Sequence, residues 1–225
     1  YTLSLHDALP ICRAAIRAKV EGFAATVEPD GGRRAAHVRA ARDYLALARR
    51  ALSPSPPRLV AIGGRSGTGK STLAAALAPS LGPLPGAVVL RSDVIRKRLL
   101  GREPAERLPE EAYGPEVSAR VFASIAERAG ELLAAGHACI ADAVYGQQDQ
   151  RAGIEAVADR AGVPFTGLWL EAPEPLLEAR VGARTGDASD ADARVVRLQR
   201  GIDGEQVRWR RLRADRPMDV LLDEA

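Results

Sequence analysis

The 225-residue chain is predicted to be an α/β protein with three layers. We expect a five-stranded parallel sheet between helices, with a small lid and preceding N-terminal helices. Apolar strand patterns alternate with helix patterns from residue 58 onward, which is typical of a parallel sheet covered on both faces. A glycine-rich turn, GGRSGTGKST, ends the first apolar run. Polar or acidic side chains follow the later strands, and ligands of such sheets bind at the carboxyl ends of the strands.

The glycine-rich turn matches the phosphate-binding pattern G-x-x-x-x-G-K-[ST], known as the P-loop. Glycines let successive N–H groups face an anion, and a helix beginning near Gly69 adds the positive end of its dipole. We expect Lys70 to reach the β- and γ-phosphates of ATP and the Ser71 hydroxyl to bind Mg²⁺. The fold is therefore predicted to be a P-loop NTPase fold. The nucleotide-binding positions would be Gly64, Ser66, Gly67, Thr68, Gly69, Lys70, Ser71 and Thr72.

The dinucleotide pattern G-x-G-x-x-G is an alternative interpretation of the same turn. Gly67 and Gly69 begin it, but Thr72 stands where the third glycine belongs. Asp93 lies near the distance expected of a ribose-binding acid. This alternative gives Lys70 no role, so the P-loop interpretation is favoured.

The region before the P-loop is divided by composition. Residues 13–52 carry two helical patterns, which break at Glu28-Pro29-Asp30-Gly31-Gly32, and the proline-rich residues 53–57 form a stiff linker. The opening YTLSLHDALPI resembles the translation of a common short-read sequencing adapter, so residues 1–12 are interpreted as an artefact. Residues 13–52 are interpreted as the helical remnant of an upstream domain, and residues 58–225 as the P-loop domain.

Each expected element of the P-loop domain follows from its own pattern. Apolar runs predict strands at 58–64, 87–93, 138–145, 165–172 and 207–214. Pro115 suits the first position of a long helix that ends near residue 135, before Gly136. The other helices are expected at 70–78, from 94 to 100, and at 148–162, 174–185, 190–200 and 217–222. Ser189-Asp190-Ala191-Asp192 is interpreted as the capping sequence of the helix at 190–200.

The composition excludes several function classes. The chain contains no asparagine, which rules out a guanine-reading N-K-x-D motif and a protein-kinase catalytic loop. Its only cysteines, Cys12 and Cys139, give no disulfide framework, so a cytoplasmic location is expected. The 32 basic and 29 acidic residues form no compact basic block with interleaved aromatics, so nucleic acid is not an expected partner. Prolines and glycines interrupt the uncharged residues 71–90, so no membrane span is predicted.

Four further stretches carry a family resemblance: LRSDVIRKRL, AGHACIADAVY, GVPFTGLWLEAP and ARTGDASDADARVV. With the P-loop, residues 58–216 resemble the small P-loop kinases grouped with zeta toxin, chloramphenicol phosphotransferase, gluconate kinase and the polynucleotide 5′-kinase domain. They look most like the ATP-binding module fused behind aminoglycoside-phosphotransferase-like domains in bacteria. The resemblance implies phosphoryl transfer from ATP to a hydroxyl of a small acceptor whose identity it does not supply, and a covalently fused upstream domain.

Three residues after the second and third strands receive roles from this resemblance. Asp93 would face the acceptor hydroxyl as its base, and Arg96 would hold the acceptor or the moving phosphoryl group. Asp142 would support Mg²⁺ through water together with Ser71. The alternatives are a helix N-cap for Asp93, a solvated charge for Arg96, and a carboxylate bonded to the P-loop backbone for Asp142.

Two arginines of the expected lid complete the predicted site. Arg180 and Arg184 are one helical turn apart and precede Thr185-Gly186-Asp187-Ala188, a small-residue loop suited to a lid. Arg184 would stabilise the transferring phosphate and Arg180 would contact the nucleotide. Surface salt bridges are the alternative for both. The residues expected to carry the catalysis are Asp93, Lys70, Arg96 and Arg184.

Two other functions remain open from the sequence. One is a regulatory module that binds ATP and controls a fused domain without transferring phosphate. The other is a kinase for the 5′ ends of nucleic acids, whose activity would fall steeply with salt.

Overall fold

The computed structural model of the chain describes residues 5–52, 55–103, 105–183, 188–202 and 206–225. The chain divides into two compact units, residues 1–55 and residues 56–225. The division falls inside the predicted linker.

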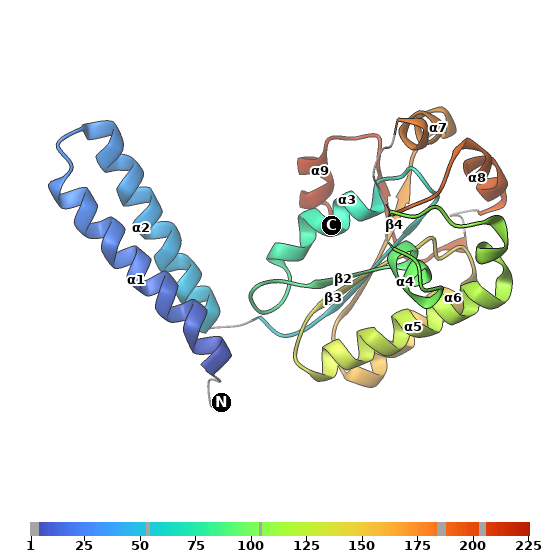
Figure 1. Cartoon of the computed structure of the whole chain (residues 1–225), viewed down its shortest axis with the longest axis horizontal. Helices are drawn as coiled ribbons and strands as arrows, with labels where there is room; N and C mark the ends of the chain where they lie inside the picture. The colour runs from blue at the N-terminus through green and yellow to red at the C-terminus, as the bar shows by residue number, and fades with distance from the viewer. Residues whose placement is uncertain (1–4, 53–54, 104, 184–187, 203–205) are drawn as a thin grey trace. The chain divides into compact units, whose positions relative to one another are not determined.

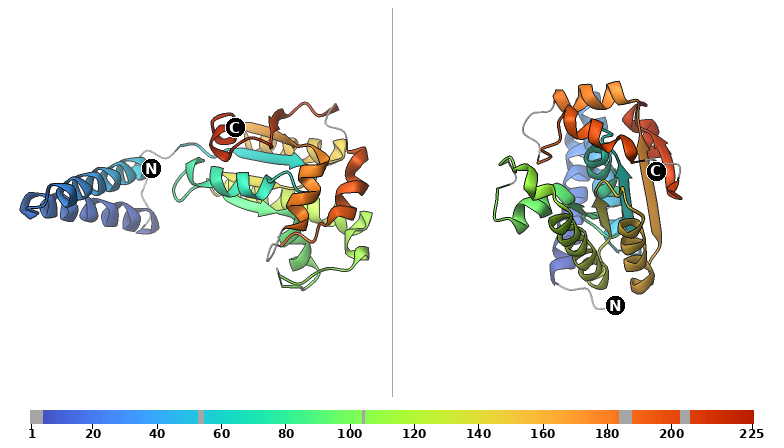
Figure 2. Two further views of the ribbon diagram at one scale, coloured as in Figure 1. Left: turned by 90° about the horizontal axis from the view of Figure 1, so that it is seen from above. Right: turned by 90° about the vertical axis from the view of Figure 1, so that its right-hand side faces the viewer.

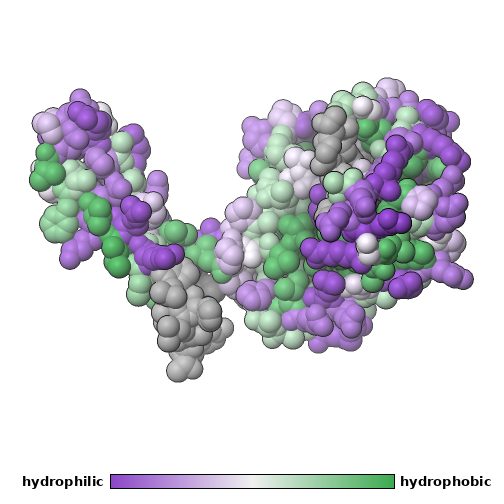
Figure 3. All heavy atoms as spheres, in the orientation of Figure 1, coloured by the Kyte–Doolittle hydropathy of each residue, from purple (hydrophilic) through white to green (hydrophobic). Residues whose placement is uncertain are grey.

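The first unit is a hairpin of two helices, α1 (Leu5–Val27) and α2 (Gly31–Leu52). The break between them covers 28–30, because Gly31 and Gly32 join the second helix. The helix α1 begins within residues 1–12, the segment interpreted as an artefact. A contact of 2.6 Å between His37 Nδ1 and Glu21 Oε2 joins the helices. Four large apolar side chains of α1 are 50–80% exposed: Ile16, Val20, Phe23 and Val27. In Figure 3 hydrophobic and hydrophilic residues alternate over the surface of the hairpin.

The second unit contains a five-stranded sheet in the order β2-β3-β1-β4-β5, and every neighbouring pair is parallel. This confirms the predicted sheet and the α/β class. The first strand lies in the middle, so that the turn after it opens at the centre of the carboxyl edge. The strands are β1 (Leu59–Gly64), β2 (Val88–Arg91), β3 (Cys139–Asp142), β4 (Phe165–Glu171) and β5 (Arg210–Arg213).

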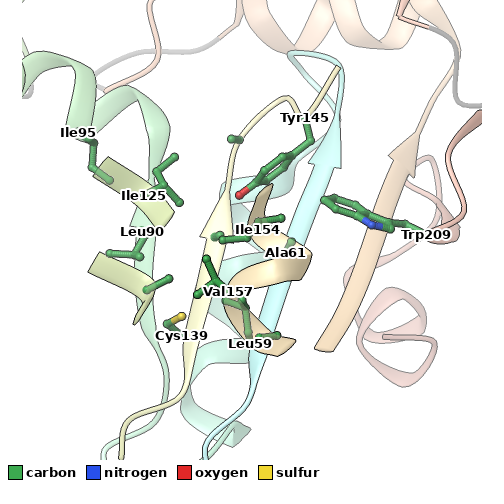
Figure 4. Close-up of a cluster of buried hydrophobic side chains, with 14 of the residues drawn as sticks. Leu59, Ala61, Leu90, Ile95, Ile125, Cys139, Tyr145, Ile154, Val157 and Trp209 are labelled. Carbon is green, nitrogen blue, oxygen red and sulfur yellow. The ribbon is translucent and has the colours of Figure 1, made fainter. Parts of the chain in front are cut away.

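Alternate residues of the central strand enter two different cores, because successive side chains of a strand point to opposite faces. Leu59 and Ala61 pack with α5 (Pro115–Ala134) and α6 (Gln148–Ala161) (Figure 4). Val60 and Ile62 pack with α3 (Lys70–Leu77) and α9 (Met218–Asp223). Helices therefore cover both faces of the sheet, as Figure 2 shows, and the three-layer prediction is confirmed.

Aromatic rings fill the core on the α5–α6 face. The Trp209 ring lies 5.1 Å from the Tyr145 ring, measured between centroids (Figure 4). The Phe165 ring lies 5.9 Å from Trp209. Gly167 of β4 makes room for the indole, because a Cβ at that position would stand 2.3 Å from the ring. The strand β4 thus carries a glycine where a larger residue would displace Trp209.

The remaining helices lie between the strands in the chain or, like η1 and η3, extend an earlier helix (Figure 1). The strand β2 is shorter than predicted: it ends at Arg91, because Ser92 already belongs to α4. Asp192 caps α8 by accepting a hydrogen bond of 3.1 Å from the Val195 N–H, so that helix begins at Ala193 rather than at 190. These elements are α4 (Ser92–Leu99), α7 (Glu174–Gly182), α8 (Ala193–Leu198) and the short helices η1 (Ala78–Ser80), η2 (Glu110–Tyr113) and η3 (Gln199–Gly201).

Across the described residues, no helix combines the length and the apolar character that crossing a membrane requires.

Candidate functional site

The P-loop connects the end of β1 to the start of α3. Three of its glycines have positive φ angles: Gly64 at 131°, Gly67 at 86° and Gly69 at 87°. Residues with a Cβ rarely adopt this conformation. Neighbouring backbone also excludes a side chain at two of them, since a Cβ would stand 2.4 Å from Leu170 O at Gly64 and 2.7 Å from Leu177 O at Gly67. At Gly69 no atom lies within 4 Å of such a Cβ, so there the backbone angle alone calls for glycine.

The Lys70 ammonium lies over the P-loop and donates hydrogen bonds to Gly64 O at 2.9 Å and to Arg65 O at 3.0 Å. These two carbonyls hold the cation inside the curve of the loop. The Thr68 hydroxyl donates to Arg65 O at 2.8 Å, and Thr68 is only 2% exposed. Its side chain therefore stabilises the turn, and only its backbone remains for the predicted contact with a nucleotide.

Ser71 and Asp142 form the part of the site predicted to serve a metal. The Ser71 hydroxyl donates to Asp142 Oδ2 at 2.5 Å, and Arg91 Nε lies 3.7 Å from the same oxygen. Burial raises the pKa of the Asp142 carboxyl above its usual value, although Lys70 and Ser71 act in the opposite direction. Mg²⁺ prefers oxygen ligands and usually keeps several waters, so one hydroxyl and one buried carboxylate are a donor set that fits it.

A cavity of about 1060 Å³ opens above the P-loop. Its wall contains residues from the P-loop, α4, η2, the start of α5, the start of α6 and the α8 segment, by which we mean residues 188–202. The predicted site residues that line it are Ser66, Gly67, Gly69, Lys70, Ser71, Thr72, Asp93, Arg96 and Asp142. The structure therefore brings together residues that lie up to 76 positions apart in the chain.

Asp93 lies in the first turn of α4 and is half-buried against the cavity. The residue that caps this helix is Arg91, so Asp93 does not act as its N-cap. Among the described residues, its carboxylate has no hydrogen-bond or ion-pair partner. A carboxylate in this position is available to a ligand in the cavity.

Arg96 lies one turn further along α4 and is only 7% exposed. Its Nη1 donates to Ala112 O at 2.8 Å and to Ser118 Oγ at 3.3 Å, and the guanidinium stacks over the Tyr113 ring at 4.9 Å. Burial lowers its pKa, and the nearby Asp93 acts against that shift. Nε is buried without a hydrogen-bond partner among the described residues. Arg96 is thus a cation built into the wall rather than a solvated surface charge.

The structure places one of the two predicted lid arginines, Arg180. Arg180 Nη2 donates to Ala214 O at 2.9 Å, next to the end of β5, and Arg180 does not line the cavity. Arg184 lies outside the described residues, as does most of the predicted lid loop. Gly64 belongs to the P-loop but also does not line the cavity.

Asp190 is a site residue that sequence reasoning assigned to a helix cap. Its carboxylate instead accepts three hydrogen bonds, from Lys97 Nζ at 3.1 Å, the Leu108 N–H at 3.0 Å and the Tyr113 hydroxyl at 2.7 Å. Burial alone raises its pKa, but these donors outweigh burial and lower the pKa below the usual value. Asp190 thereby joins the α8 segment to the wall that carries Arg96.

Further residues of the cavity were missed by the sequence analysis. Two ion pairs connect the loop before η2, and η2 itself, with α8: Arg107 with Asp192 at 3.3 Å, and Arg194 with Glu110 at 3.2 Å. Gln199 accepts a hydrogen bond from the P-loop, as described below. No local motif marks these positions, because their partners are distant in sequence.

The AAA domain family AAA_33 matches residues 59–201 of the chain. The chain belongs to this family. The match begins with β1 and ends in η3, so this AAA domain contains the P-loop and all the residues that line the cavity except Ile202.

Curated relatives of this AAA domain occur in mycobacteria. The uncharacterized protein Rv2004c of Mycobacterium tuberculosis (strain H37Rv) and the uncharacterized protein Mb2027c of Mycobacterium bovis are each 32% identical to this chain over 198 residues. The alignment covers 86% of this chain and 38% of each relative. The chain therefore spans well under half the length of these relatives.

Solved structures of kinases share the fold. The APS kinase CysC of Mycobacterium tuberculosis, in complex with AMPPNP and APS, aligns with a TM-score of 0.56 and 22% identity, over 76% of this chain and 96% of that one. A sugar kinase from Janibacter sp. HTCC2649 aligns with a TM-score of 0.52 and 20% identity, over 75% of this chain and 91% of that one. At these identities the likeness shows a P-loop kinase-like fold.

Proposed function

We propose that this AAA domain transfers the γ-phosphoryl group of ATP to a hydroxyl of a small acceptor. The P-loop N–H groups and Lys70 would hold the β- and γ-phosphates, and Ser71 with Asp142 would hold Mg²⁺. Bound Mg²⁺ supplies neutralisation of the phosphate charge. The protein's own part is then to position the acceptor and to accept its proton.

The observation that carries this proposal is the Asp93 carboxylate. It is half-buried, it has no hydrogen-bond or ion-pair partner among the described residues, and it lines the same cavity as Lys70 and Ser71. As the acceptor oxygen forms its bond to the γ-phosphorus and the bond to ADP breaks, Asp93 would take the hydroxyl proton. A positioned general base contributes about 10² to 10⁴ in rate.

Arg96 would hold the acceptor against Asp93. Its guanidinium is fixed by Ala112, Ser118 and Tyr113, so it is oriented before a ligand arrives. Arg184 is proposed to stabilise the transferring phosphoryl group. Arg180 would reach the nucleotide only after its hydrogen bond to Ala214 O is broken.

The charges of the cavity favour a small acceptor over nucleic acid. Its lining has no basic excess: the basic residues are Lys70, Arg96, Arg107 and Arg194, and the acidic ones are Asp93, Glu110, Asp142, Asp190 and Asp192. A polynucleotide would require a surplus of cations along its backbone. The solved kinases with this fold include an APS kinase in complex with APS and a gluconokinase. Both names refer to small-molecule acceptors.

The test is acceptor-dependent release of ADP from Mg²⁺–ATP, screened over hydroxyl metabolites, sugars, antibiotics and oligonucleotides, with Lys70→Ala as the background. A small hydroxyl compound that accelerates release and gains a phosphate supports the proposal. Binding of ATP without acceleration by any acceptor supports the regulatory-module alternative. Acceleration by oligonucleotides alone, with a steep loss in salt, supports the 5′-end kinase.

A further inference from the structure

A side-chain oxygen occupies part of the P-loop in this structure. The backbone N–H of Ser66, the third residue of the motif, donates to Gln199 Oε1 at 2.7 Å. Both residues line the cavity, and Ser66 is 9% exposed. Gln199 begins η3, directly after α8, and is separated from Ser66 by 133 positions in the chain.

A second contact between the same two segments supports the first. Arg65 Nη2 donates to Val196 O of α8 at 2.7 Å and to Glu174 Oε2 at 3.0 Å. Glu174 in turn pairs with Arg200 at 2.5 Å. Two consecutive P-loop residues therefore hold the carboxyl end of α8, one through a side chain and one through the backbone N–H.

The bond to Ser66 resembles the interaction that the P-loop makes with phosphate. Phosphate oxygens are bound in such loops by backbone N–H groups that converge on an anion. An amide oxygen carries a partial negative charge, so it satisfies such an N–H when no phosphate is present. One N–H makes one well-aligned hydrogen bond, and a phosphate oxygen that reaches it must displace the amide.

We propose that Gln199 is a latch residue whose side-chain oxygen takes the place of a phosphate oxygen at the Ser66 N–H and is displaced when the triphosphate binds. This inference rests on the proposed function, because it requires ATP in the P-loop. Nucleotide binding then breaks a bond between the P-loop and the α8 segment. The latch lowers the apparent affinity for ATP by the fraction of molecules in which it is closed.

The other end of the α8 segment gives this displacement a consequence for the acceptor side. There Asp190 accepts hydrogen bonds from Lys97, Leu108 and Tyr113, and the Tyr113 ring covers Arg96. The α8 segment thus connects the P-loop with the wall that is proposed to hold the acceptor. Release of Gln199 loosens one anchor of that segment and leaves the other in place.

Two substitutions at Gln199 should shift ATP affinity in opposite directions. Gln199→Leu removes the competing oxygen, so the Kd for a Mg²⁺-bound non-hydrolysable ATP analogue should fall about threefold to tenfold, the range set by one net hydrogen bond. Gln199→Glu places a full negative charge at the same N–H, so the Kd should rise about tenfold or more. Gln148→Leu is the matched control, since Gln148 is exposed on α6 and does not line the cavity; its Kd should equal that of the unaltered protein.

Calorimetric titration at one salt concentration gives the three Kd values, and the melting temperature without nucleotide shows that each variant is folded. Gln199→Met replaces Gln199→Leu if the latter does not fold. A raised Kd for both Gln199 variants would make Gln199 a ligand of the nucleotide and overturn the latch, and so would an unchanged Kd for both. If the unaltered protein does not bind the analogue, the proposed function fails together with the latch.

Discussion

The Ser71 hydroxyl donates a hydrogen bond of 2.5 Å to Asp142 Oδ2, and so joins the first turn of α3 to the last residue of β3. The two residues belong to separate sequence patterns, one the P-loop and the other an apolar strand. Parallel pairing of β1 with β3 sets Ile62 beside Asp142, which brings the carboxylate to the start of the P-loop. The two oxygens predicted to serve Mg²⁺ are therefore neighbours before any metal is bound.

Replacing Asp142 or Asp93 by asparagine should separate their two predicted roles, metal binding and proton acceptance. Asp142→Asn should raise the Mg²⁺ concentration needed for half-maximal ATP binding, because the amide is a weaker ligand and also a donor. Asp93→Asn should leave this Mg²⁺ requirement nearly unchanged and lower acceptor-dependent turnover by about 10² or more. Magnesium titrations of ATP binding and of ADP release measure both effects. The opposite pattern would exchange the two roles.

Lys70→Ala should remove nearly all stabilisation of the protein by nucleotide, because Lys70 is the one lysine among the described residues that line the cavity. A ligand at 100 times its Kd raises the free energy of unfolding by about 2.7 kcal/mol, and this gain should vanish. Thermal unfolding with and without Mg²⁺–ATP measures it. Lys19→Ala is the control, since Lys19 lies over the Phe23 ring in the hairpin. An unchanged gain in Lys70→Ala would contradict the P-loop assignment.

Arg96→Met should raise the KM of a working acceptor about tenfold or more while the Kd of ATP changes little. The guanidinium donates to Ala112 and Ser118 on the wall proposed to hold the acceptor, and among the described residues it makes no hydrogen bond to the P-loop. Some stability should also be lost, about 1–3 kcal/mol, because Ala112 O loses its donor. Arg98→Met is the matched control, because Arg98 is exposed on the same helix. Steady-state kinetics and chemical unfolding measure the two effects, and an ATP Kd that rises as much as the KM would place Arg96 on the nucleotide instead.

Asp190 should make a pH-dependent contribution to stability. Since its pKa is lower in the folded chain than in the unfolded one, its contribution is complete above the unfolded pKa of about 3.9 and is lost as the pH falls through the folded value. Asp190→Asn should therefore be less stable than the unaltered protein by a constant amount at pH 7 and pH 5, and the difference should shrink below pH 4. Urea unfolding at each pH measures it. A difference that grows with acid would show that Asp190 is not stabilised as a carboxylate.

The parts of the molecule that sequence predicted well are those specified by neighbouring residues. The P-loop, the five strands and Pro115 at the start of α5 each follow from a pattern within a few positions. The strand ends were less accurate, because capping decided them: α4 begins at Ser92 and so shortens β2. Local patterns therefore predict the sheet and the phosphate nest together.

The other walls of the cavity depend on contacts between distant segments. Asp190 accepts hydrogen bonds from Lys97 and Tyr113, which are 93 and 77 positions away in the chain. The local pattern Ser189-Asp190-Ala191-Asp192 instead predicted a capping role for it. Asp192, two residues later, is the residue that caps α8. Arg180 presents the same difficulty, since its observed partner is a backbone carbonyl of Ala214, which has no sequence signature. A charged side chain shows its type in the sequence, but its partner is chosen by the packing of the fold.

Substitutions at Gly67 would affect the folding of the protein as well as phosphate binding. Its backbone lies so close to α7 that any side chain would collide with Leu177 O. Its positive φ angle also disfavours any residue with a Cβ. A mutant allele at Gly67 would therefore disturb the docking of α7 whether or not the cell supplies a nucleotide. Loss of function in such an allele could come from misfolding as well as from failed phosphate binding. Alleles at Lys70 or Ser71 separate these two causes.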